Sequence, residues 1–353
     1  MTAPPLLDVQ GITKRFVAGR TWAGRPSAFV NAVDGVSLTI DAGETLALVG
    51  ESGCGKSTVG RLVLNLIEPT AGTVFCDGHD LSRLSPPDLR AFRAKAQIIF
   101  QDPYASLNPR MTIGDTLGEP LMLHTALTKA QRLERLGELL DMVGLKPDHA
   151  RRYPHEFSGG QRQRIAIARA LAASPKLIVC DEPVSALDVS SRAQILNLLR
   201  ELQARFGLAL LFISHDLSVV KHIADRTAVM DLGRIVETAP TPQLFATPRH
   251  PYTQALLSAI PVPSPFARRQ RRLLPGDPPS PIDPPAGCHL HTRCPRAIEH
   301  CRSAIPPLVS ASDDHATACH RWREIGQDGY ASVIERPHSP NLQRLIDAFR
   351  PTT

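Results

Sequence analysis

Residues 50–58 of the chain read GESGCGKST, which fits the pattern G-x-x-x-x-G-K-[ST]. The apolar run ETLALV (44–49) precedes them, and VGRLVLNLI (59–67) follows with the apolar spacing of a helix. In such a strand, loop and helix, glycines let backbone N–H groups point into one concavity at the helix N-terminus, where the helix dipole favours negative charge. The sequence therefore predicts a phosphate-binding loop (P-loop) and, with it, a nucleotide site.

The side chains of this loop have separate expected roles. Lys56 reaches the β- and γ-phosphates of a nucleoside triphosphate, and the Ser57 hydroxyl ligates Mg²⁺. The other expected phosphate contacts are Gly50, Ser52, Gly53, Gly55 and Thr58. The alternative is a chance glycine-rich turn, which at about 7% glycine would occur in roughly one chain in a hundred of this length. The strand and helix around the loop make that alternative rarer still.

Composition is that of an ordinary globular protein. The chain has 353 residues, 42% of them hydrophobic and 21% charged, which is enough for about two to three domains. No stretch approaches the roughly 18 apolar residues of a membrane-spanning helix, and the opening MTAPPLLDVQ lacks the features of a secretory signal. We therefore expect a cytosolic, thiol-reducing location. The net charge of +6 is compatible with nucleic acid, phosphate or anionic headgroups and singles out none.

The chain divides into three parts by composition. Up to about residue 245, short apolar runs alternate with helical patterns, which predicts an α/β core with a parallel sheet. Within it, residues 102–165 lack strand signals and indicate an inserted helical subdomain. Nine prolines in residues 261–285 favour a linker or an extended segment. We predict a nucleotide-binding domain over 1–260, a Pro- and Cys-rich extension over 261–335, and a helix or tail over 336–353.

Acidic residues follow a second apolar run, LIVC (177–180). Asp181 and Glu182 would lie at the carboxyl edge of a parallel sheet, where ligands bind in open α/β folds. Alone, such a pair is more often a solvated strand end. Beside a P-loop, Asp181 is expected to hold Mg²⁺ through water, and Glu182 to deprotonate the attacking water. His215 closes the apolar run LLFIS and is expected to hydrogen-bond the γ-phosphate; a structural histidine is the alternative.

A second glycine-rich cradle occurs in FSGGQ (157–161), where Ser158, Gly159, Gly160 and Gln161 lead into a helix. One chain then has two cradles for one triphosphate. Because the P-loop already occupies one flank of the phosphates, the second cradle is expected to close on a nucleotide held by another chain. The alternative is a glycine N-cap on an amphipathic, Arg-rich helix.

These motifs, in this order over residues 6–245, resemble the nucleotide-binding subunits of ATP-binding cassette transporters. FSGGQ is similar to the LSGGQ signature of that family, with Phe157 in place of Leu. The resemblance implies a RecA-like P-loop ATPase core, an antiparallel β subdomain and an inserted helical subdomain. By position, Phe16 in ITKRF resembles the aromatic that stacks on adenine. Gln101 in IIFQDP resembles the glutamine that links Mg²⁺ to the helical subdomain, and Asp188 in SALD belongs to the D-loop.

Three stretches narrow the resemblance: residues 100–115, 181–199 and 248–261 are similar to ATPase subunits of bacterial dipeptide, oligopeptide and nickel importers, the dipeptide type most of all. This implies ATP and Mg²⁺ as cofactors and a peripheral place on the cytoplasmic face of the inner membrane. The implied partners are a second ATPase subunit in a heterodimer, two permeases and an extracytoplasmic peptide-binding protein, without nucleic acid.

Three alternatives to a peptide importer stay open. They are a nickel importer ATPase, a soluble cassette ATPase of phosphonate breakdown, and a soluble cassette ATPase that acts on nucleic acid or ribosomes. The last is disfavoured because such proteins usually carry two cassettes, whereas this chain has one P-loop and one signature.

Four cysteines near the end of the chain have the spacing C-x5-C-x6-C-x17-C. They are Cys288, Cys294, Cys301 and Cys319. The spacing resembles a carboxy-terminal element that holds a [4Fe–4S] cluster in some of these importers, and thiolates suit such a cluster. Zinc is an alternative, although its sites usually contain close C-x2–4-C pairs, and free thiols are another.

Other features of this region are open as well. His289, His291 and His320 flank the cysteines and compete as ligands. A cluster is expected to staple the proline-rich segment structurally, in preference to sensing redox state. The basic run RRQRR (268–272) is a solvated linker or a headgroup contact.

Overall fold

The computed structural model describes residues 4–22, 24–260, 267–269, 272–312, 314–325 and 333–335. The helix or tail predicted over 336–353 lies outside the described residues, as do residues 270 and 271 of the basic run.

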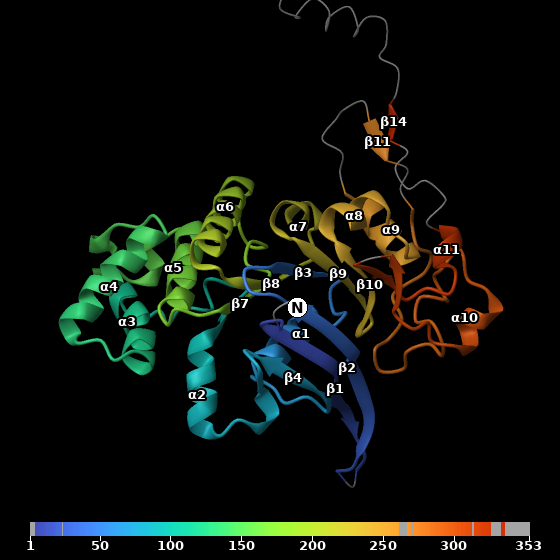
Figure 1. The fold of residues 1–353 in the computed structure, drawn as a ribbon, viewed down its shortest axis with the longest axis horizontal. Helices are drawn as coiled ribbons and strands as arrows, with labels where there is room; N and C mark the ends of the chain where they lie inside the picture. The colour runs from blue at the N-terminus through green and yellow to red at the C-terminus, as the bar shows by residue number, and fades with distance from the viewer. Residues whose placement is uncertain are drawn as a thin grey trace, which may run out of the picture.

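The centre of the molecule is an eight-stranded sheet (Figure 1). In spatial order its strands are β12 (Val309–Ser312), β13 (His315–Thr317), β10 (Arg234–Pro240), β9 (Arg226–Asp231), β3 (Thr45–Val49), β8 (Ala209–Ser214), β7 (Leu177–Asp181) and β6 (Ala96–Ile99). Strands β6, β7, β8, β3 and β9 run parallel. Every residue of β3, β7 and β8 is buried, because helices or a second sheet cover both faces. The predicted α/β core with a parallel sheet is confirmed.

A second, antiparallel sheet covers one face of this core. It consists of β2 (Pro26–Ile40), β1 (Leu7–Arg20), β4 (Ala71–Cys76) and β5 (His79–Asp80), in that order. Its buried side chains share one hydrophobic cluster with α1 (Lys56–Val63) and with one face of β3, β7 and β8. The helix that follows the P-loop is therefore enclosed between the two sheets. Helix η1 (Leu81–Arg83) and helix α2 (Pro86–Lys95) lead from β5 to β6.

Helices cover the opposite face of the core sheet and extend beyond one end of it (Figure 1). They are α3 (Ile113–His124), α4 (Lys129–Met142), α5 (Gly159–Leu171), α6 (Val189–Phe206), α7 (Leu217–Ile223), α8 (Thr241–Ala246) and α9 (Pro251–Ser258), with the short helices η2 (Pro147–Arg151) and η3 (Pro154–Glu156) before α5. Thr112, Thr128 and Ser158 begin α3, α4 and α5 with reciprocal capping boxes. In Figure 1, α3 and α4 lie farthest from the sheet.

The C-terminal region joins the core sheet, which the sequence analysis did not predict. Strand β13 pairs with β10, placing Thr317 opposite Glu237. The Glu237 carboxylate is fully buried and accepts hydrogen bonds from the backbone N–H groups of Arg249 (2.6 Å) and His250 (3.0 Å). It also contacts Nε2 of His315 at 2.8 Å. One satisfied carboxylate thus ties β10, β13 and the start of α9 together.

The proline-rich part before this strand has neither helix nor strand over 272–285. Its backbone contacts β2, since Asn31 donates its N–H to the carbonyl of Pro281 at 3.0 Å. Helices α10 (Glu299–Ser303) and α11 (Trp322–Ile325) are short, and β11 (Ala267–Arg269) pairs with β14 (Val333–Glu335).

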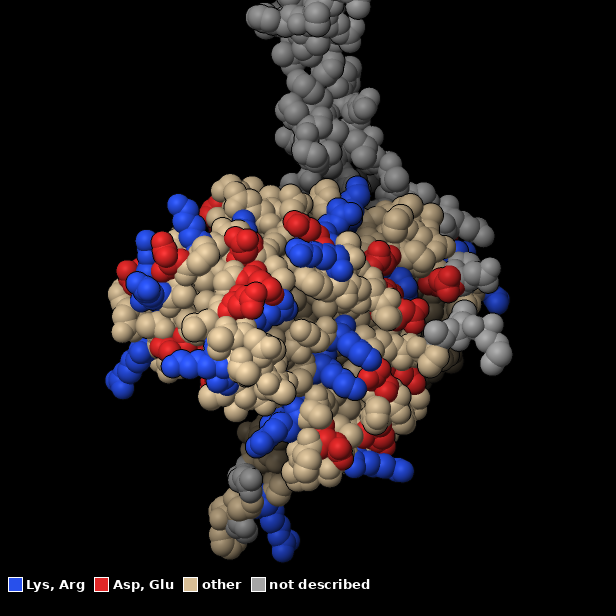
Figure 2. Space-filling model, turned by 60° about the vertical axis from the view of Figure 1, so that its left-hand side comes forward, with Lys and Arg blue, Asp and Glu red and all other residues tan. Residues whose placement is uncertain are grey.

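Two features of the described residues bear on membranes and partners. None of their helices has both the length and the apolar character required to traverse a bilayer. Figure 2 shows the side of the molecule that carries the helices of the 102–206 region, where basic and acidic side chains are interspersed among uncharged ones.

Candidate nucleotide site

A cavity of about 490 Å³ opens over the P-loop at the carboxyl edge of the parallel strands. Its walls are Val30, Ala32, Ser52, Gly53, Gly55, Lys56, Ser57, Thr58, Gln101, Glu182 and His215. These residues come from β2, the P-loop and the ends of β6, β7 and β8. Sequence motifs that are up to about 160 residues apart thus face one cavity. This is expected because ligands of open α/β sheets bind at the carboxyl ends of the strands.

The P-loop is held by its own lysine. Lys56 is buried, and its Nζ donates to the carbonyl oxygens of Gly50 (2.9 Å) and Glu51 (2.8 Å). Gly55 caps α1 with φ 109°, and a Cβ there would lie 2.1 Å from the carbonyl oxygen of Ala32, so only glycine fits. The ammonium group is therefore placed at the mouth of a loop whose shape depends on glycine.

Ser57 and Asp181 meet beneath this loop. The Ser57 hydroxyl donates to Oδ1 of Asp181 at 2.8 Å. Burial raises the pKa of Asp181 above its usual range, and the hydrogen bond from Ser57 opposes that rise. A hydroxyl and a carboxylate are the hard oxygen ligands that Mg²⁺ prefers, so this pair fits the ion expected from the sequence.

Glu182 lies between two polar side chains. Its Oε2 accepts a hydrogen bond from Nε2 of Gln101 at 3.0 Å, and its Oε1 lies 3.1 Å from Nδ1 of His215. The backbone of Glu182 has φ 47°, a left-handed conformation that non-glycine residues rarely adopt and that concentrates at functional sites. Glu182, the expected base for the attacking water, thus contacts both Gln101 and His215.

The signature residues, 158–161, lie outside the cavity over the P-loop. Ser158 is the N-cap of α5 and forms a capping box with Gln161, while Gly159 and Gly160 form the first turn. None of these four residues lines the cavity over the P-loop.

Two further expected residues also lie outside the lining. Phe16 is 40% exposed and pairs across β1 and β2 with Val30, which does line the cavity. Asp188 begins α6, and hydrogen bonds from Ser190 and Ser191 hold its pKa well below the usual range.

The four C-terminal cysteines lie within electrostatic range of one another: Cys301 acts on Cys288 and Cys294, and all three act on Cys319. Backbone N–H groups two residues onward contact the sulfur atoms of Cys288, Cys294 and Cys319. Burial raises the pKa of Cys288 to about 11 and that of Cys319 to about 12. Among the described residues, no group of three or more His, Cys, Asp or Glu side chains has the arrangement of a site for a metal ion.

The flanking histidines have mixed surroundings. Nδ1 of His291 contacts the carbonyl oxygen of Cys288 at 2.8 Å, and Nε2 of His320 contacts that of Ala304 at 3.1 Å. Nδ1 of His289 is buried without a hydrogen-bond partner.

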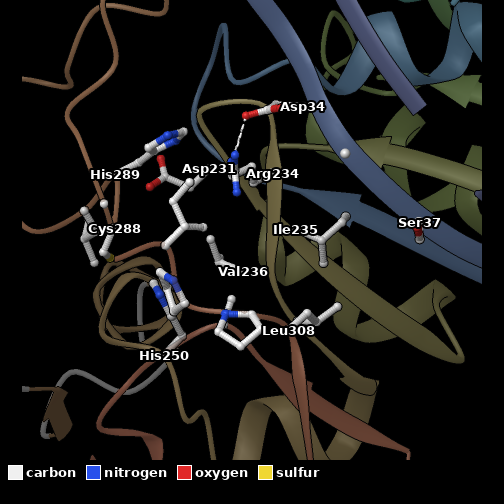
Figure 3. A pocket seen from close by; sticks show the side chains of 17 residues that line it. Asp34, Ser37, Asp231, Arg234, Ile235, Val236, His250, Cys288, His289 and Leu308 are labelled. Carbon is white, nitrogen blue, oxygen red and sulfur yellow. Dashed lines mark hydrogen bonds and ion pairs between the residues drawn. The ribbon is translucent and has the colours of Figure 1, made fainter. Parts of the chain in front are cut away.

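A separate cavity of about 400 Å³ lies between β10 and the C-terminal region (Figure 3). Asp231, Cys288 and His289 lie together on one side of it, and the Asp34–Arg234 ion pair lies nearby. Burial, followed by the charge of Glu51, raises the pKa of Asp231 to about 6. This cavity lacks the P-loop and its hydroxyl groups, so the cavity over the P-loop remains the candidate nucleotide site.

Three residues at the P-loop were not predicted from the sequence. They are Glu51 of the loop itself, together with Tyr252 and Arg293, which contact Glu51 from the C-terminal side. Glu51 is within the motif, but the motif assigns no role to that position. No local pattern indicates that Tyr252 or Arg293 reaches the loop.

Comparisons with known proteins agree with this geometry. The family "ABC transporter" matches residues 33–185, and the family "Oligopeptide/dipeptide transporter, C-terminal region" matches residues 236–301. A putative peptide import ATP-binding protein of Brucella ovis is 55% identical over 91% of this chain and 99% of its own length. An oligopeptide transport ATP-binding protein of Bacillus subtilis, AppF, is 51% identical over 90% of this chain and 97% of its own length.

A solved structure is also similar. It is a dimeric, post-hydrolysis ATP-binding cassette bound to ADP and phosphate, with a TM-score of 0.59 and 30% identity over 67% of this chain and 98% of that chain. The chain therefore belongs to the ATP-hydrolysing subunits of the ABC transporter family, in the branch that has the oligopeptide/dipeptide transporter C-terminal region.

Proposed function

We propose that this chain hydrolyses ATP to drive the uptake of dipeptides or oligopeptides through membrane permeases. The observation that carries the proposal is that relatives similar along nearly their whole length, C-terminal region included, are named as peptide import ATP-binding proteins. These names favour peptides over nickel. They also favour an importer over a soluble ATPase of phosphonate breakdown.

ATP binding begins at the P-loop. Lys56 Nζ now contacts two carbonyl oxygens of its own loop, and its ammonium group is the cation that faces incoming phosphate. Ser57 and Asp181, with Gln101 at the cavity wall, are the residues that would hold Mg²⁺. The ion held there would supply positive charge that offsets the negative charge of the phosphates. Phe16, on the strand beside Val30, is the proposed adenine contact.

Hydrolysis uses the Glu182 group. Gln101 and His215 hold the two carboxylate oxygens of Glu182 at the cavity wall. From this position the carboxylate accepts a proton from the water that attacks the γ-phosphorus. His215, which is more exposed than Glu182, then hydrogen-bonds the γ-phosphate from the solvent side. Proton transfer to Glu182 depends on Gln101 and His215, because these two side chains orient its carboxylate.

The site is completed by a second ATPase subunit. Ser158, Gly159, Gly160 and Gln161 present a capped helix N-terminus outside the P-loop cavity of their own chain, as does Asp188 for α6. A helix N-terminus is suited to a γ-phosphate supplied by another chain. The similar solved cassette is dimeric. We favour a heterodimer, in which each chain closes over the nucleotide of its partner.

The remaining partners are two permeases and an extracytoplasmic peptide-binding protein, with this chain bound at the cytoplasmic face of the inner membrane. Met122, Leu123 and Leu133 support a docking face, because these large apolar side chains on α3 and α4 are each more than half exposed. Exposed apolar side chains that gather on one subdomain are typical of protein interfaces.

For the four C-terminal cysteines we propose a [4Fe–4S] cluster. Four sulfur ligands complete a cubane, and the N–H contacts to three of the sulfurs favour thiolates, against the larger effect of burial, which raises the pKa of these thiols. Zinc sites usually contain close C-x2–4-C pairs, which the spacing of these four cysteines lacks. Such a cluster would fasten the C-terminal region structurally.

The test of the peptide function is uptake by the assembled transporter. The chain, purified from membranes of its native host, is expected to co-purify with two multi-spanning permeases. Vesicles containing the complex are expected to accumulate a labelled dipeptide with ATP, and to stop doing so with Lys56→Ala. Nickel uptake in place of dipeptide uptake, or purification without permeases, would overturn the proposal.

A further inference from the structure

The segment that carries three of the four cysteines, residues 287–303 (the cysteine segment), contacts the P-loop through one side chain. Nη1 of Arg293 lies 3.4 Å from Oε2 of Glu51, although the two residues are 242 positions apart. The side chain of Arg293 is 9% exposed and that of Glu51 34%. A cation held almost out of water is costly unless its partner stays in place. The contact therefore constrains both segments.

The core of the protein sets the position of Arg293. Its backbone N–H donates to the carbonyl of Leu290 at 2.9 Å, and the Leu290 side chain is buried in the main hydrophobic cluster. The two ends of the segment are joined, since Cys288 donates its N–H to the carbonyl of Cys301 at 2.8 Å. Gly287 allows this approach, because a Cβ there would lie 2.5 Å from the same carbonyl oxygen. These contacts fix the backbone around Arg293, so that its guanidinium is held in place to contact Glu51.

Glu51 is held from two further sides. Its backbone N–H donates to the hydroxyl of Tyr252 at 2.9 Å, and Tyr252 is fully buried in α9. Its carbonyl oxygen accepts from Nζ of Lys56 at 2.8 Å. The peptide of Glu51 therefore connects the phosphate-binding lysine to residues of the C-terminal side.

Arg293 also faces a second carboxylate. Asp231, at the end of β9, is buried and lies within electrostatic range of both Glu51 and Arg293. Figure 3 shows Asp231 beside Cys288 and His289 of the cysteine segment. Without the guanidinium, two carboxylates would repel each other directly behind the P-loop.

We propose that Arg293 is a positioning residue of the ATP site, which holds Glu51 and so keeps the P-loop in the shape that receives phosphate. The cysteine segment is then a functional part of the nucleotide site as well as an appendage of the fold. The proposal concerns ATP binding in this chain and is independent of the transported solute.

A simpler explanation makes a different prediction. If Arg293 and Glu51 acted only through their charges on the anionic nucleotide, Arg293→Gln would weaken ATP binding and Glu51→Gln would strengthen it. If the pair positions the loop, both substitutions release the same contact. Both are then expected to weaken binding, and the sign of the Glu51→Gln effect separates the two explanations.

The experiment measures the Kd of a fluorescent ATP analogue with Mg²⁺, and the KM and kcat of ATP hydrolysis, on the full-length chain. We expect Arg293→Gln and Glu51→Gln each to raise Kd and KM roughly five-fold, the effect of a partly buried charged hydrogen bond, with kcat within about two-fold of wild type. The double variant is expected to resemble either single variant, because both remove one interaction. Arg293→Lys is expected to recover part of the affinity.

The matched control is Arg302→Gln, which removes the same charge from the same segment at an exposed position paired with Glu299. It is expected to bind ATP as the wild type does. Thermal unfolding of each variant shows whether the fold is intact. If Arg293→Gln unfolds the segment, Glu51→Gln decides alone, since it leaves the segment unchanged. Wild-type or tighter ATP binding by Glu51→Gln, or additive effects in the double variant, would overturn the proposal.

Discussion

Gln101 donates a hydrogen bond to Glu182, with Nε2 and Oε2 3.0 Å apart, although the two residues follow different strands of the core sheet. This contact joins Gln101, two residues after the end of β6, to the proposed general base. Any movement of the segment that begins at Gln101 therefore reaches the carboxylate that activates water.

Glu182→Gln is expected to reduce ATP turnover by at least about 100-fold, because an amide cannot accept the proton of the attacking water. ATP affinity is expected to stay within about two-fold, since Lys56 and Ser57 are unchanged. Steady-state hydrolysis and nucleotide titration of the assembled complex measure the two effects. Glu201→Gln, at an exposed position of α6, is the matched control and is expected to have wild-type turnover. Undiminished hydrolysis by Glu182→Gln would refute the assigned base.

Anaerobically purified protein is expected to contain about four iron atoms per chain, with the visible absorbance of an iron–sulfur cluster. Cys294→Ser is expected to lose both, because one thiolate of the cubane is gone. Cys76→Ser, which changes a cysteine of β4 far along the sequence, is expected to keep both. Metal analysis and absorption spectra provide the measurement. One zinc per chain, or equal iron in Cys294→Ser, contradicts the cluster.

Glu237→Ala is expected to lower the free energy of unfolding by about 3 kcal/mol, because two backbone N–H groups and the buried imidazole of His315 lose their acceptor. Urea denaturation measures the change. Glu138→Ala is the control, since Glu138 is half exposed and pairs with Arg135 on the surface of α4; it is expected to change stability by less than about 0.5 kcal/mol. A similar small change in Glu237→Ala would show that β10 and β13 are held by other contacts.

Stability is expected to fall as the pH drops below 6.5, in part through His250. This side chain is fully buried at the N-cap of α9, and burial lowers its pKa to about 4, while the charge of Glu237 opposes the shift. The unfolded chain, with a histidine pKa of about 6.5, then binds the proton more readily, so the stability present above pH 6.5 is lost as the pH falls toward 4.

His250→Asn tests this assignment, because asparagine also caps a helix but does not titrate in this range. Between pH 7.5 and pH 5, the wild type is expected to lose about 2 kcal/mol more than the variant. Denaturation curves at the two pH values give the difference. Parallel losses in both proteins would mean that other groups cause the pH dependence.

The features that were predicted from the sequence are those encoded by short, continuous stretches of it. GESGCGKST is one continuous motif between a buried strand and a helix, and Asp181, Glu182 and His215 directly follow strands of uniform apolar character. Parallel strands bring their carboxyl ends to one edge, so the meeting of these residues follows from the fold class. The cavity lining over the P-loop agrees with that reasoning.

The parts that escaped prediction depend on long-range contacts. Residues 315–317 form a strand only because β10 offers them a pairing edge, and the prolines upstream hide that signal. The contact of Arg293 with Glu51 depends on how the cysteine segment folds back, for which residue spacing gives no measure. The role of the signature residues depends on a second chain, and in their own chain they lie outside the cavity over the P-loop.

The division of the ATP site between two subunits is tested most directly by Ser158→Arg, introduced into this chain alone. In the isolated chain, ATP binding to the P-loop is expected to be unchanged, whereas hydrolysis by the assembled complex is expected to fall at least ten-fold, an effect of the size of one lost phosphate-site donor or more. If the isolated, monomeric chain instead hydrolyses ATP as fast as the complex, and Ser158→Arg changes neither rate, the shared site is contradicted.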